Sequence, residues 1–373
     1  MILIPSLSSG GAERVTVNLA NYWVNSGHAV TVTTLDTGSH SFYPLDPEVK
    51  LVGINLASES KSKFFAAWVN IRRLYAVRQV LRSEVPDVAL GMMPAANVLL
   101  AINSWRLKGT FFVGAERVHP PTVNIGRQWE WLRRATYRFL DVVVAQTHES
   151  ARWIRANLKV RKVEIVPNPV VWPLPTQEPT IEPKLFIKPD RKILIAVGRM
   201  TDQKQFKLLI ECFARLSDKN PQWDLVILGE GPDRQQLLSL TENLNVSGRV
   251  KLPGRVGNLA DWYQSADLFV LSSKFEGFPN VLVEAMSYGL ASISFDCDTG
   301  PRDILRNEVD GLLLPLNDRE ALIGAIARLM IREDQRTEFA ARAKEVRQRF
   351  AIQKIAEKWL QVFTSGRAGS ISS

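Results

Sequence analysis

The sequence predicts an α/β protein of two domains, each with a doubly wound parallel sheet, that face a common cleft. At 373 residues the chain is too long for one small core. Short β-branched runs alternate with helical stretches in both halves, a pattern typical of parallel sheets. A proline-rich stretch at residues 166–189 interrupts the pattern, and proline continues neither a helix nor a central strand. We therefore expect residues 166–189 to be an interdomain linker.

The first half opens with a short expected strand at residues 2–4, followed by a loop and helix at 5–28 and a strand at 29–36. Further β-branched runs occur at residues 87–93, 110–116 and 141–147. This succession predicts βαβ units in an N-terminal domain of residues 1–168.

The second half repeats the architecture without repeating the sequence. Strands are expected at residues 192–200 and 224–231, and helices at 207–218 and 233–244. The segments 250–256, 259–266, 268–273 and 290–296 continue the series, and long helices run from Arg319 to about Phe363. We expect the C-terminal domain at residues 169–351.

Composition and charge exclude several classes of protein. The two cysteines, Cys212 and Cys297, lie far apart in apolar runs, which predicts a reducing cytoplasm rather than a disulfide or zinc site. We expect no signal peptide, because no basic n-region follows Met1, and no membrane-spanning segment, because no apolar run approaches about 20 residues. Residues 1–170 carry 20 Lys and Arg against 12 Asp and Glu, a net +8, and residues 171–373 carry 27 against 26, a net +1. This basic first half suits an anionic membrane, nucleic acid or a phosphorylated acceptor.

The segment "FEGFPNVLVEAMSYG" at residues 275–289 places two carboxylates beside a helix start. Pro279 suits the first helical turn and Gly289 the end of the helix. Glu276 and Gly277 lie in the preceding loop, and Glu284 lies over a turn into the helix. A helix N-terminus attracts phosphate, while carboxylates accept hydrogen bonds from sugar hydroxyls. The combination fits a nucleotide sugar.

These residues resemble the E-x7-E motif of retaining glycosyltransferases of the GT-B fold, family 4. The resemblance covers nearly the whole chain, through "PSLSSGGAERV", "VGRMTDQKQF", "LPGRVGNLADWYQSADLFVLSS" and "DTGPRDIL". It implies two Rossmann-like domains, with a C-terminal helix at about residues 352–373 crossing back to the first domain. The opening and the "TGPRDIL" segment are most similar to bacterial enzymes that build surface polysaccharides or lipid-linked oligosaccharides. Asp303 stands where the family often has glutamate, which leaves its role open.

The resemblance implies roles for four residues of the second domain. Glu276 would contact hydroxyls of the transferred sugar, and Glu284 the ribose hydroxyls. Arg199 and Lys204 follow an expected strand, where ligands of open sheets gather, and would stabilise the charge on the leaving diphosphate. Ordinary solvated surface charges are the competing interpretation. Further donor contacts are expected at Gly10, Gly11, Arg255, Val256, Gly277, Phe278, Pro279 and Asn280.

The first domain offers weaker candidates. Gly10 and Gly11 form a strand-to-helix turn whose amides would face the donor diphosphate or the acceptor, with a bare tight turn as the alternative. His119 follows a strand end, and related enzymes often place a histidine near the donor sugar or the β-phosphate. A structural histidine is an equal alternative. Glu116 and Arg117 share this loop and, with His119, are candidate acceptor contacts.

Residues 126–140 predict an amphipathic helix. Its basic face, at about 100° per residue, comprises Arg127, Glu130, Arg134 and Arg138, flanked by Trp131 and Tyr137. The opposite face comprises Trp129, Leu132 and Phe139. Basic residues edged by aromatic ones suit an anionic membrane interface, with Arg127, Trp131, Arg134 and Arg138 toward the lipid. An ordinary surface helix is the alternative.

With the resemblance, these features predict a retaining glycosyltransferase that uses neither metal nor cofactor. It would transfer a hexose or N-acetylhexosamine from a nucleotide diphosphate sugar, UDP-linked by resemblance, to a lipid-linked or saccharide acceptor. Asp296 and Asp298 have the spacing of a metal-binding pair, but we expect them in a loop. The enzyme would work in the cytoplasm at the inner membrane surface, without nucleic acid.

Three alternatives remain at this stage. A non-catalytic scaffold that binds sugar nucleotides would keep the same binding residues. A GT-B relative with other chemistry, such as a phosphorylase, is disfavoured because no lysine stands out as a pyridoxal site. A nucleic-acid-binding module is disfavoured because the chain has no recognisable reading motif.

Overall fold

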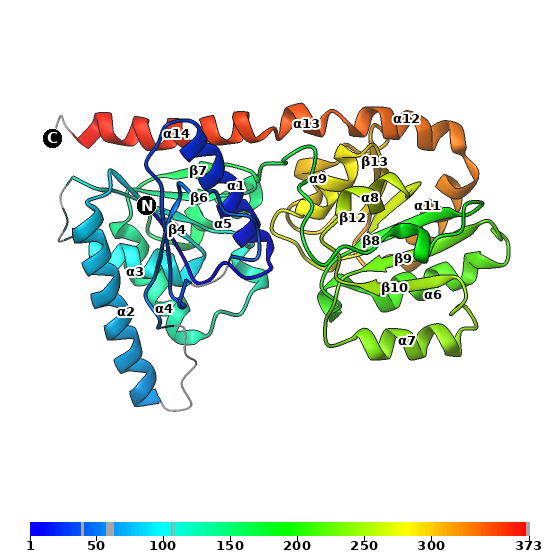
Figure 1. Cartoon of the computed structure of the whole chain (residues 1–373), viewed down its shortest axis with the longest axis horizontal. Helices are drawn as coiled ribbons and strands as arrows, with labels where there is room; N and C mark the ends of the chain where they lie inside the picture. Colours follow the sequence, from blue (N-terminus) through cyan, green and yellow to red (C-terminus); the bar gives the residue numbers. More distant parts are fainter. Residues whose placement is uncertain (39–40, 57–62, 106, 108, 371–373) are drawn as a thin grey trace. The chain divides into compact units, whose positions relative to one another are not determined.

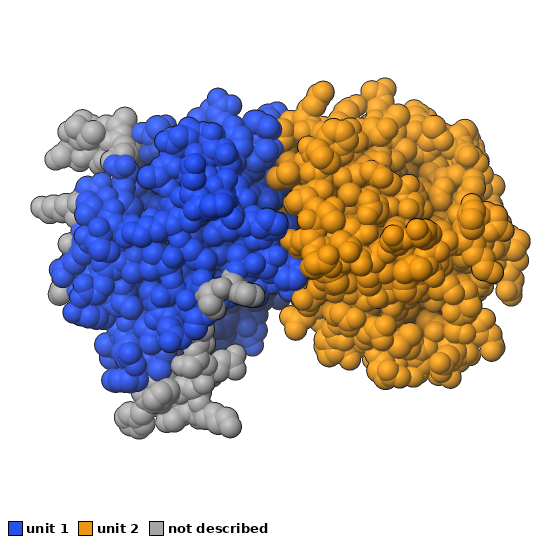
Figure 2. Space-filling view, in the orientation of Figure 1, with its two compact units in different colours: residues 1–169, 352–373 blue, residues 170–351 orange. Residues whose placement is uncertain are grey.

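The computed structural model describes residues 1–38, 41–56, 63–105, 107 and 109–370. The described chain divides into two compact units, residues 1–169 with 352–373 and residues 170–351 (Figures 1 and 2). We call them unit 1 and unit 2.

Unit 1 contains a parallel sheet in which the described strands follow the order β3-β2-β1-β4-β5-β6-β7. Its strands are β1 (Ile2–Ile4), β2 (Thr31–Thr34), β3 (Lys50–Gly53), β4 (Val88–Met92), β5 (Phe111–Ala115), β6 (Val142–Ala145) and β7 (Val163–Ile165). Its helices are α1 (Gly11–Asn25), α2 (Lys63–Glu84), α3 (Pro94–Ser104), α4 (Arg127–Thr136), α5 (His148–Asn157) and α14 (Ile352–Ser370). Short 3-10 turns occur at η1 (Pro120–Thr122) and η2 (Tyr137–Phe139).

Unit 2 contains a second parallel sheet, in which the described strands follow the order β10-β9-β8-β11-β12-β13. Its strands are β8 (Lys192–Val197), β9 (Trp223–Leu228), β10 (Val250–Gly254), β11 (Leu268–Leu271), β12 (Ala291–Phe295) and β13 (Gly311–Leu314). Its helices are α6 (Phe206–Ser217), α7 (Arg234–Asn243), α8 (Leu259–Gln264), α9 (Asn280–Ser287), α10 (Pro301–Ile304), α11 (Arg319–Ile331), α12 (Glu333–Ala343) and α13 (Val346–Arg349). The 3-10 turns are η3 (Pro183–Leu185) and η4 (Asp202–Lys204).

Both sheets are buried on both faces, which explains their continuous apolar runs. In unit 1, Ile2 and Ile4 of β1 join one apolar cluster, while Leu3 joins the cluster on the other face. In unit 2, Leu194 and Ile195 of β8 divide in the same way. The predicted parallel α/β architecture is confirmed in both halves.

Helix α14 follows unit 2 in sequence but packs on unit 1. Ile355, Trp359 and Phe363 are buried in the cluster that contains Ile2 and Trp23. The rings of Trp23 and Phe363 meet edge to face, with centroids 5.7 Å apart. Apolar packing therefore fixes the return of the C-terminal helix to unit 1.

The proline-rich stretch does not behave as a free linker along its length. The boundary between the units lies inside it, between Pro169 and Val170. Beyond that point the chain packs on unit 2, where Pro179 O accepts a hydrogen bond from Gly257 N at 2.7 Å. Trp262 Nε1 likewise donates to Ile181 O at 3.0 Å. Side chains such as Ile181, Phe186 and Ile187, which are partly buried, account for this packing.

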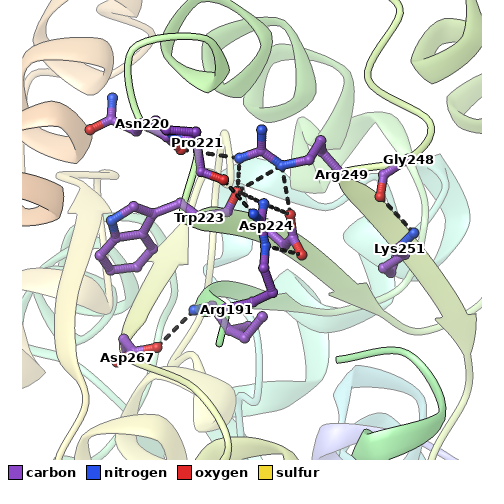
Figure 3. A network of polar contacts seen from close by, with 10 residues as sticks. Arg191, Asn220, Pro221, Trp223, Asp224, Gly248, Arg249, Lys251 and Asp267 are labelled. Carbon is purple, nitrogen blue, oxygen red and sulfur yellow. Dashed lines mark hydrogen bonds and ion pairs between the residues drawn. The ribbon is translucent and has the colours of Figure 1, made fainter. Parts of the chain in front are cut away.

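A polar network ties together the amino ends of three strands in unit 2 (Figure 3). Asp224 in β9 is nearly buried and accepts hydrogen bonds from Arg191 Nη2 at 2.5 Å and Arg249 Nε at 2.7 Å. The two arginines, which precede β8 and β10, also donate to backbone carbonyls of Pro221 and Trp223. Because these groups are paired with one another, we interpret the network as stabilising the sheet. It lies at the amino ends of the strands, and the candidate site described next lies at their carboxyl ends.

Candidate functional site

The strand order of unit 2 reverses direction between β8 and β11. Ligands of open parallel sheets bind outside the carboxyl ends of the strands at such a reversal, because the connecting loops separate there. The two segments that leave this point are the loop from Gly198 to Lys204 after β8 and the loop from Ser272 to Pro279 after β11. They carry Arg199, Lys204 and residues 276–279, which are among the residues for which the sequence predicts donor contacts.

Lys204 and Glu276 meet at this switch point. Lys204 Nζ lies 2.6 Å from Glu276 Oε1, and the side chains are only 14% and 9% exposed. Gly198 makes room for the lysine, because a Cβ at this position would lie 2.9 Å from Lys204 Cε. Two charges held this far from water keep their geometry only while they remain paired or receive other polar partners. Two of the residues for which the sequence predicts donor contacts therefore lie side by side, while their roles stay predictions.

Hydrogen bonds hold the two loops against each other. Ser272 Oγ donates to Lys204 O at 2.7 Å, and Lys274 N donates to Gln203 O at 2.8 Å. Gln203 Nε2 returns a bond to Phe275 O at 2.8 Å. The positions of Lys204 and Glu276 are thus set by backbone contacts as well as by their own ion pair.

The "TGP" segment supports the Glu276 loop. Thr299 Oγ1 donates to Glu276 O at 2.6 Å. Gly300 has φ +96°, and a Cβ there would lie 2.7 Å from Pro279 Cδ, so only glycine fits this close approach. Asp303 Oδ2 accepts from Gly300 N at 3.3 Å. Asp303 therefore holds the turn that carries Gly300.

Helix α9 begins one residue later than predicted, with Pro279 as its N-cap rather than in its first turn. By helix geometry its first N–H groups, at Asn280 and Val281, point toward the loop that holds Glu276. Glu284 lies one turn along α9 and is 4% exposed. Gly289 follows the helix with φ +78°, as expected for a terminating glycine.

Other expected donor contacts vary in exposure. Arg199 is exposed and lies two residues beyond β8, and Arg255 is exposed directly after β10. Both belong to the carboxyl edge of the sheet. Phe278 is buried, with its ring 5.4 Å from that of Phe350, and Val256 is buried in the same cluster. Those two residues can face a ligand only through their backbone.

Cys297 lies beneath the site but is not a nucleophile. Its Sγ donates to Ser273 O at 3.1 Å. Burial, and secondly the charge of Glu276, raise the pKa of the Cys297 thiol to about 12. The thiol is therefore protonated at neutral pH, and a protonated thiol is unreactive.

The described residues contain no group of three or more His, Cys, Asp or Glu side chains arranged to hold a metal ion. Asp296 and Asp298 lie in a loop after β12, as predicted. Asp296 accepts a hydrogen bond from Arg302 Nε at 2.8 Å.

In unit 1, Gly10 caps helix α1 with extended backbone. The carboxylate of Glu13 folds over it, because a Cβ at Gly10 would lie 2.2 Å from Glu13 Oε2. Burial raises the pKa of Glu13. A diphosphate at Gly10 and Gly11 would therefore have to displace this carboxylate.

Glu116 belongs to a buried network under helix α4. Tyr137 Oη donates to Glu116 Oε1 at 2.5 Å, and Arg133 Nη1 lies 3.9 Å from the same oxygen. Arg133 is itself buried and also pairs with Glu130 at 2.5 Å. These contacts indicate that Glu116 has a structural role. The sequence did not predict the buried Arg133, because the helical projection placed the basic residues on the exposed face and apolar residues on the buried face.

Arg117 and His119 are also buried. Arg117 Nη2 donates to Asn168 Oδ1, which also accepts from Gln146 Nε2 at 2.7 Å. His119 Nδ1 lies 3.0 Å from Ser150 Oγ in the first turn of α5. Gln146 and Asn168 were not predicted, although Gln146 directly follows the strand β6.

Arg127, Trp131 and Arg134 of α4 and Arg138 of the following turn η2 are exposed, and we call these four residues the face of α4. Trp131 is 68% exposed. The prediction that Tyr137 borders this face is wrong, because Tyr137 is fully buried against Glu116. Phe139, predicted on the opposite face, is exposed. Within the described residues, no helix combines the length and the apolar character needed to span a membrane.

Two families of known proteins match the chain. Glycosyltransferase Family 4 matches residues 9–171, and Glycosyl transferases group 1 matches residues 177–346. The fold and these two matches therefore define a glycosyltransferase of the GT-B type. The chain belongs to these two glycosyltransferase families, one in each half.

Full-length relatives agree with this assignment. An α-1,4-N-acetyl-D-galactosaminyltransferase of Campylobacter jejuni, whose name gives a PP-undecaprenol-linked saccharide as acceptor, is 28% identical over 96% of both chains. The amylovoran biosynthesis glycosyltransferase AmsD of Erwinia amylovora is 25% identical over 96% of this chain and 97% of its own.

Solved structures share the fold. A sucrose-phosphate synthase from Thermosynechococcus elongatus superposes with a TM-score of 0.84 at 19% identity and covers 99% of both chains. HepE of Anabaena, in complex with UDP and glucose, superposes with a TM-score of 0.75 at 16% identity and covers 98% of both chains.

Proposed function

We propose that the chain is a retaining glycosyltransferase that moves a hexose or N-acetylhexosamine from a UDP-linked donor to a lipid-linked or saccharide acceptor in cell-surface glycan synthesis. The observation that carries the proposal is the buried Lys204–Glu276 pair at the switch point of unit 2. Relatives named for amylovoran and undecaprenol-linked saccharide synthesis support the acceptor class, and the UDP complex of HepE supports the donor.

The two residues of the pair would bind different parts of the donor. Lys204, with the amino end of α9, would hold the diphosphate and stabilise the charge that develops as the glycosidic bond breaks. Glu276 would exchange its ion pair for hydroxyls of the transferred sugar, and Glu284 would bind the ribose hydroxyls. A metal ion is unnecessary in this scheme because the lysine and the helix end supply the positive charge.

Retention follows from attack on the face that the diphosphate leaves. The bond from the anomeric carbon to the phosphate oxygen breaks, the acceptor oxygen bonds to the same carbon, and the leaving phosphate takes the acceptor proton. No side chain needs to form a covalent intermediate. The protonated Cys297 beneath the site is consistent with this scheme.

We further propose that the enzyme works in the cytoplasm against the inner membrane surface. Trp131 and the exposed arginines Arg127, Arg134 and Arg138 of α4 and η2 suit contact with anionic headgroups. This places a soluble donor and a membrane-borne acceptor within reach of one protein.

The test compares Lys204→Ala with Lys207→Ala, an exposed lysine one residue into α6. Sugar transfer from a panel of nucleotide sugars would be measured for both, with UDP binding measured by thermal stabilisation. We expect Lys204→Ala to lower kcat/KM by about 100-fold or more, the scale found when one charge-stabilising group is lost. Lys207→Ala should match wild type.

The outcomes separate the proposed enzyme from its rival. Full activity of Lys204→Ala would remove the site assignment. UDP binding by the wild type with neither transfer nor slow donor hydrolysis would favour a non-catalytic scaffold. Product with an inverted anomeric centre would refute retention while leaving the transferase intact.

A further inference from the structure

The carboxyl edge of the unit 1 sheet contains a buried cation with incomplete hydrogen bonding. Arg117 lies two residues beyond β5 and is 6% exposed. Its Nη2 donates to Asn168, while Nε and Nη1 have no hydrogen-bond partner among the described residues. Buried guanidinium nitrogens are normally satisfied, so this arrangement requires an explanation.

The neighbouring polar groups make a small recognition set. Gln146 follows β6 and Asn168 follows β7, so both lie at the same edge of the sheet as Arg117. Gln146 Nε2 donates to Asn168 Oδ1, and the remaining Gln146 Oε1 is buried without a partner in the described chain. The set therefore offers two donor nitrogens, Nε and Nη1 of Arg117, and one carbonyl acceptor, Gln146 Oε1.

Among the residues that the structure describes, no carboxylate forms an ion pair with Arg117. Its sequence neighbour Glu116 directs Oε1 to Tyr137 and Arg133, and Oε2 has no hydrogen-bond partner among the described residues. Burial alone accounts for the lowering of the pKa of Arg117 to about 9. A buried charge without a counter-ion lowers the free energy of unfolding. Such a cost is common at sites that bind a charged ligand.

We propose that Arg117, Gln146 and Asn168 bind an oxyanion carried by the acceptor, either a phosphate or a sugar carboxylate. The proposal rests on the proposed function, in which unit 2 holds the donor. Arg117 would supply the N–H donors, Gln146 Oε1 would accept from a hydroxyl beside the anion, and Asn168 would orient both side chains. The acceptor would then be selected by charge as well as by its sugar.

The binding test uses the full chain saturated with UDP, so that the donor position is occupied. Inorganic pyrophosphate, glucuronate and glucose would be titrated by calorimetry into wild type and Arg117→Met. We expect one of the two anions to bind wild type and glucose not to bind. Arg117→Met should lower the affinity for that anion by about 10- to 100-fold, the loss expected for hydrogen bonds to a charged group. The affinity for UDP should stay unchanged.

The anion that binds more tightly identifies the group on the acceptor. Preference for pyrophosphate indicates a phosphate, and preference for glucuronate indicates a uronic acid. Equal anion binding by wild type and Arg117→Met, or no anion binding in the presence of UDP, would overturn the proposal. Failure of UDP itself to bind would count against the proposed function instead. Arg152→Met, at an exposed position on α5, is the matched control and should bind as wild type does.

Thermal unfolding gives an independent readout with a definite sign. If Arg117 serves a ligand, Arg117→Met removes an uncompensated charge and should melt at or above wild type without ligand. If Arg117 instead serves the fold, the same variant should melt several degrees lower. The second result would overturn the proposal.

Discussion

Lys204 and Glu276 are separated by 72 positions in sequence and by 2.6 Å in space. Their meeting was predictable because both follow strands, and parallel strands end at a common edge. Gln146 and Asn168 occupy equivalent places after β6 and β7, yet nothing in their sequence context marks them. A buried amide is recognised only when its partners are known, and those partners are distant in sequence.

Glu116 leads to a prediction about how the stability of the protein depends on pH. Burial, its largest influence, raises the pKa of Glu116 above the ordinary 4.5. The folded state then holds this proton more tightly than the unfolded chain, so this contribution to the unfolding free energy is greatest below pH 4.5 and falls as pH rises through the raised pKa. Glu116→Gln cannot ionise. It should melt above wild type at pH 8, with a difference that shrinks toward pH 4.

Calorimetry between pH 4 and pH 8 checks this, with Glu149→Gln in the more exposed first turn of α5 as the control. A Glu116→Gln variant that is destabilised equally at every pH would contradict the prediction. It would mean that the charge of Glu116 stabilises Arg133 by more than burial costs.

At the scale of elements, α4 shows where periodicity succeeds and where it fails. Arg127 and Arg134 of α4 are both exposed, as a helical projection predicts, and Arg138 is exposed beyond the end of the helix. Tyr137 departs from the projection because α4 ends at Thr136 and the chain continues as the 3-10 turn η2. The hydrogen bond from Tyr137 to Glu116 then draws its ring inside, a tertiary contact that no local pattern contains.

The face of α4 also yields a prediction for membrane binding. Replacing Arg127, Arg134 and Arg138 with Gln should weaken binding to phosphatidylglycerol-rich vesicles by about 100-fold, since each basic residue near an anionic surface contributes about 1 kcal/mol. Vesicle sedimentation measures this. The matched control replaces three exposed arginines of unit 2, namely Arg215, Arg332 and Arg342.

Equal losses in the two triple variants would show that total charge, rather than the face of α4, drives binding. Absence of wild-type binding to the same vesicles would remove the membrane contact altogether.

At the scale of the whole molecule, the sequence predicts both sheets, because strand-like and helix-like segments alternate along each half of the chain. It does not predict that most of the proline-rich stretch packs on unit 2. Prolines mark where regular structure ends, but the side chains of Ile181, Phe186 and Ile187 decide where the chain then lies. The path of α14 is likewise set by apolar residues that contact partners more than 300 positions away, such as Trp23.

Trp359 tests whether the two units keep separate cores. It is fully buried in unit 1, beside Phe363 with ring centroids 5.8 Å apart. Trp359→Ala should cost about 3–5 kcal/mol of unfolding free energy, which for a unit of this size lowers its melting temperature by roughly 10 °C. Because unit 2 has its own clusters, the transition that UDP stabilises should stay in place.

Scanning calorimetry with and without UDP resolves the two transitions. Trp359→Phe keeps much of the aromatic volume, and the indole N–H that it loses has no partner in the described chain, so it should cost far less than Trp359→Ala. Trp131→Ala, at an exposed position, should change stability by no more than about 0.5 kcal/mol. If Trp359→Ala lowered both transitions equally, the units would fold as one cooperative body. The return of α14 would then couple donor binding in unit 2 to the stability of unit 1.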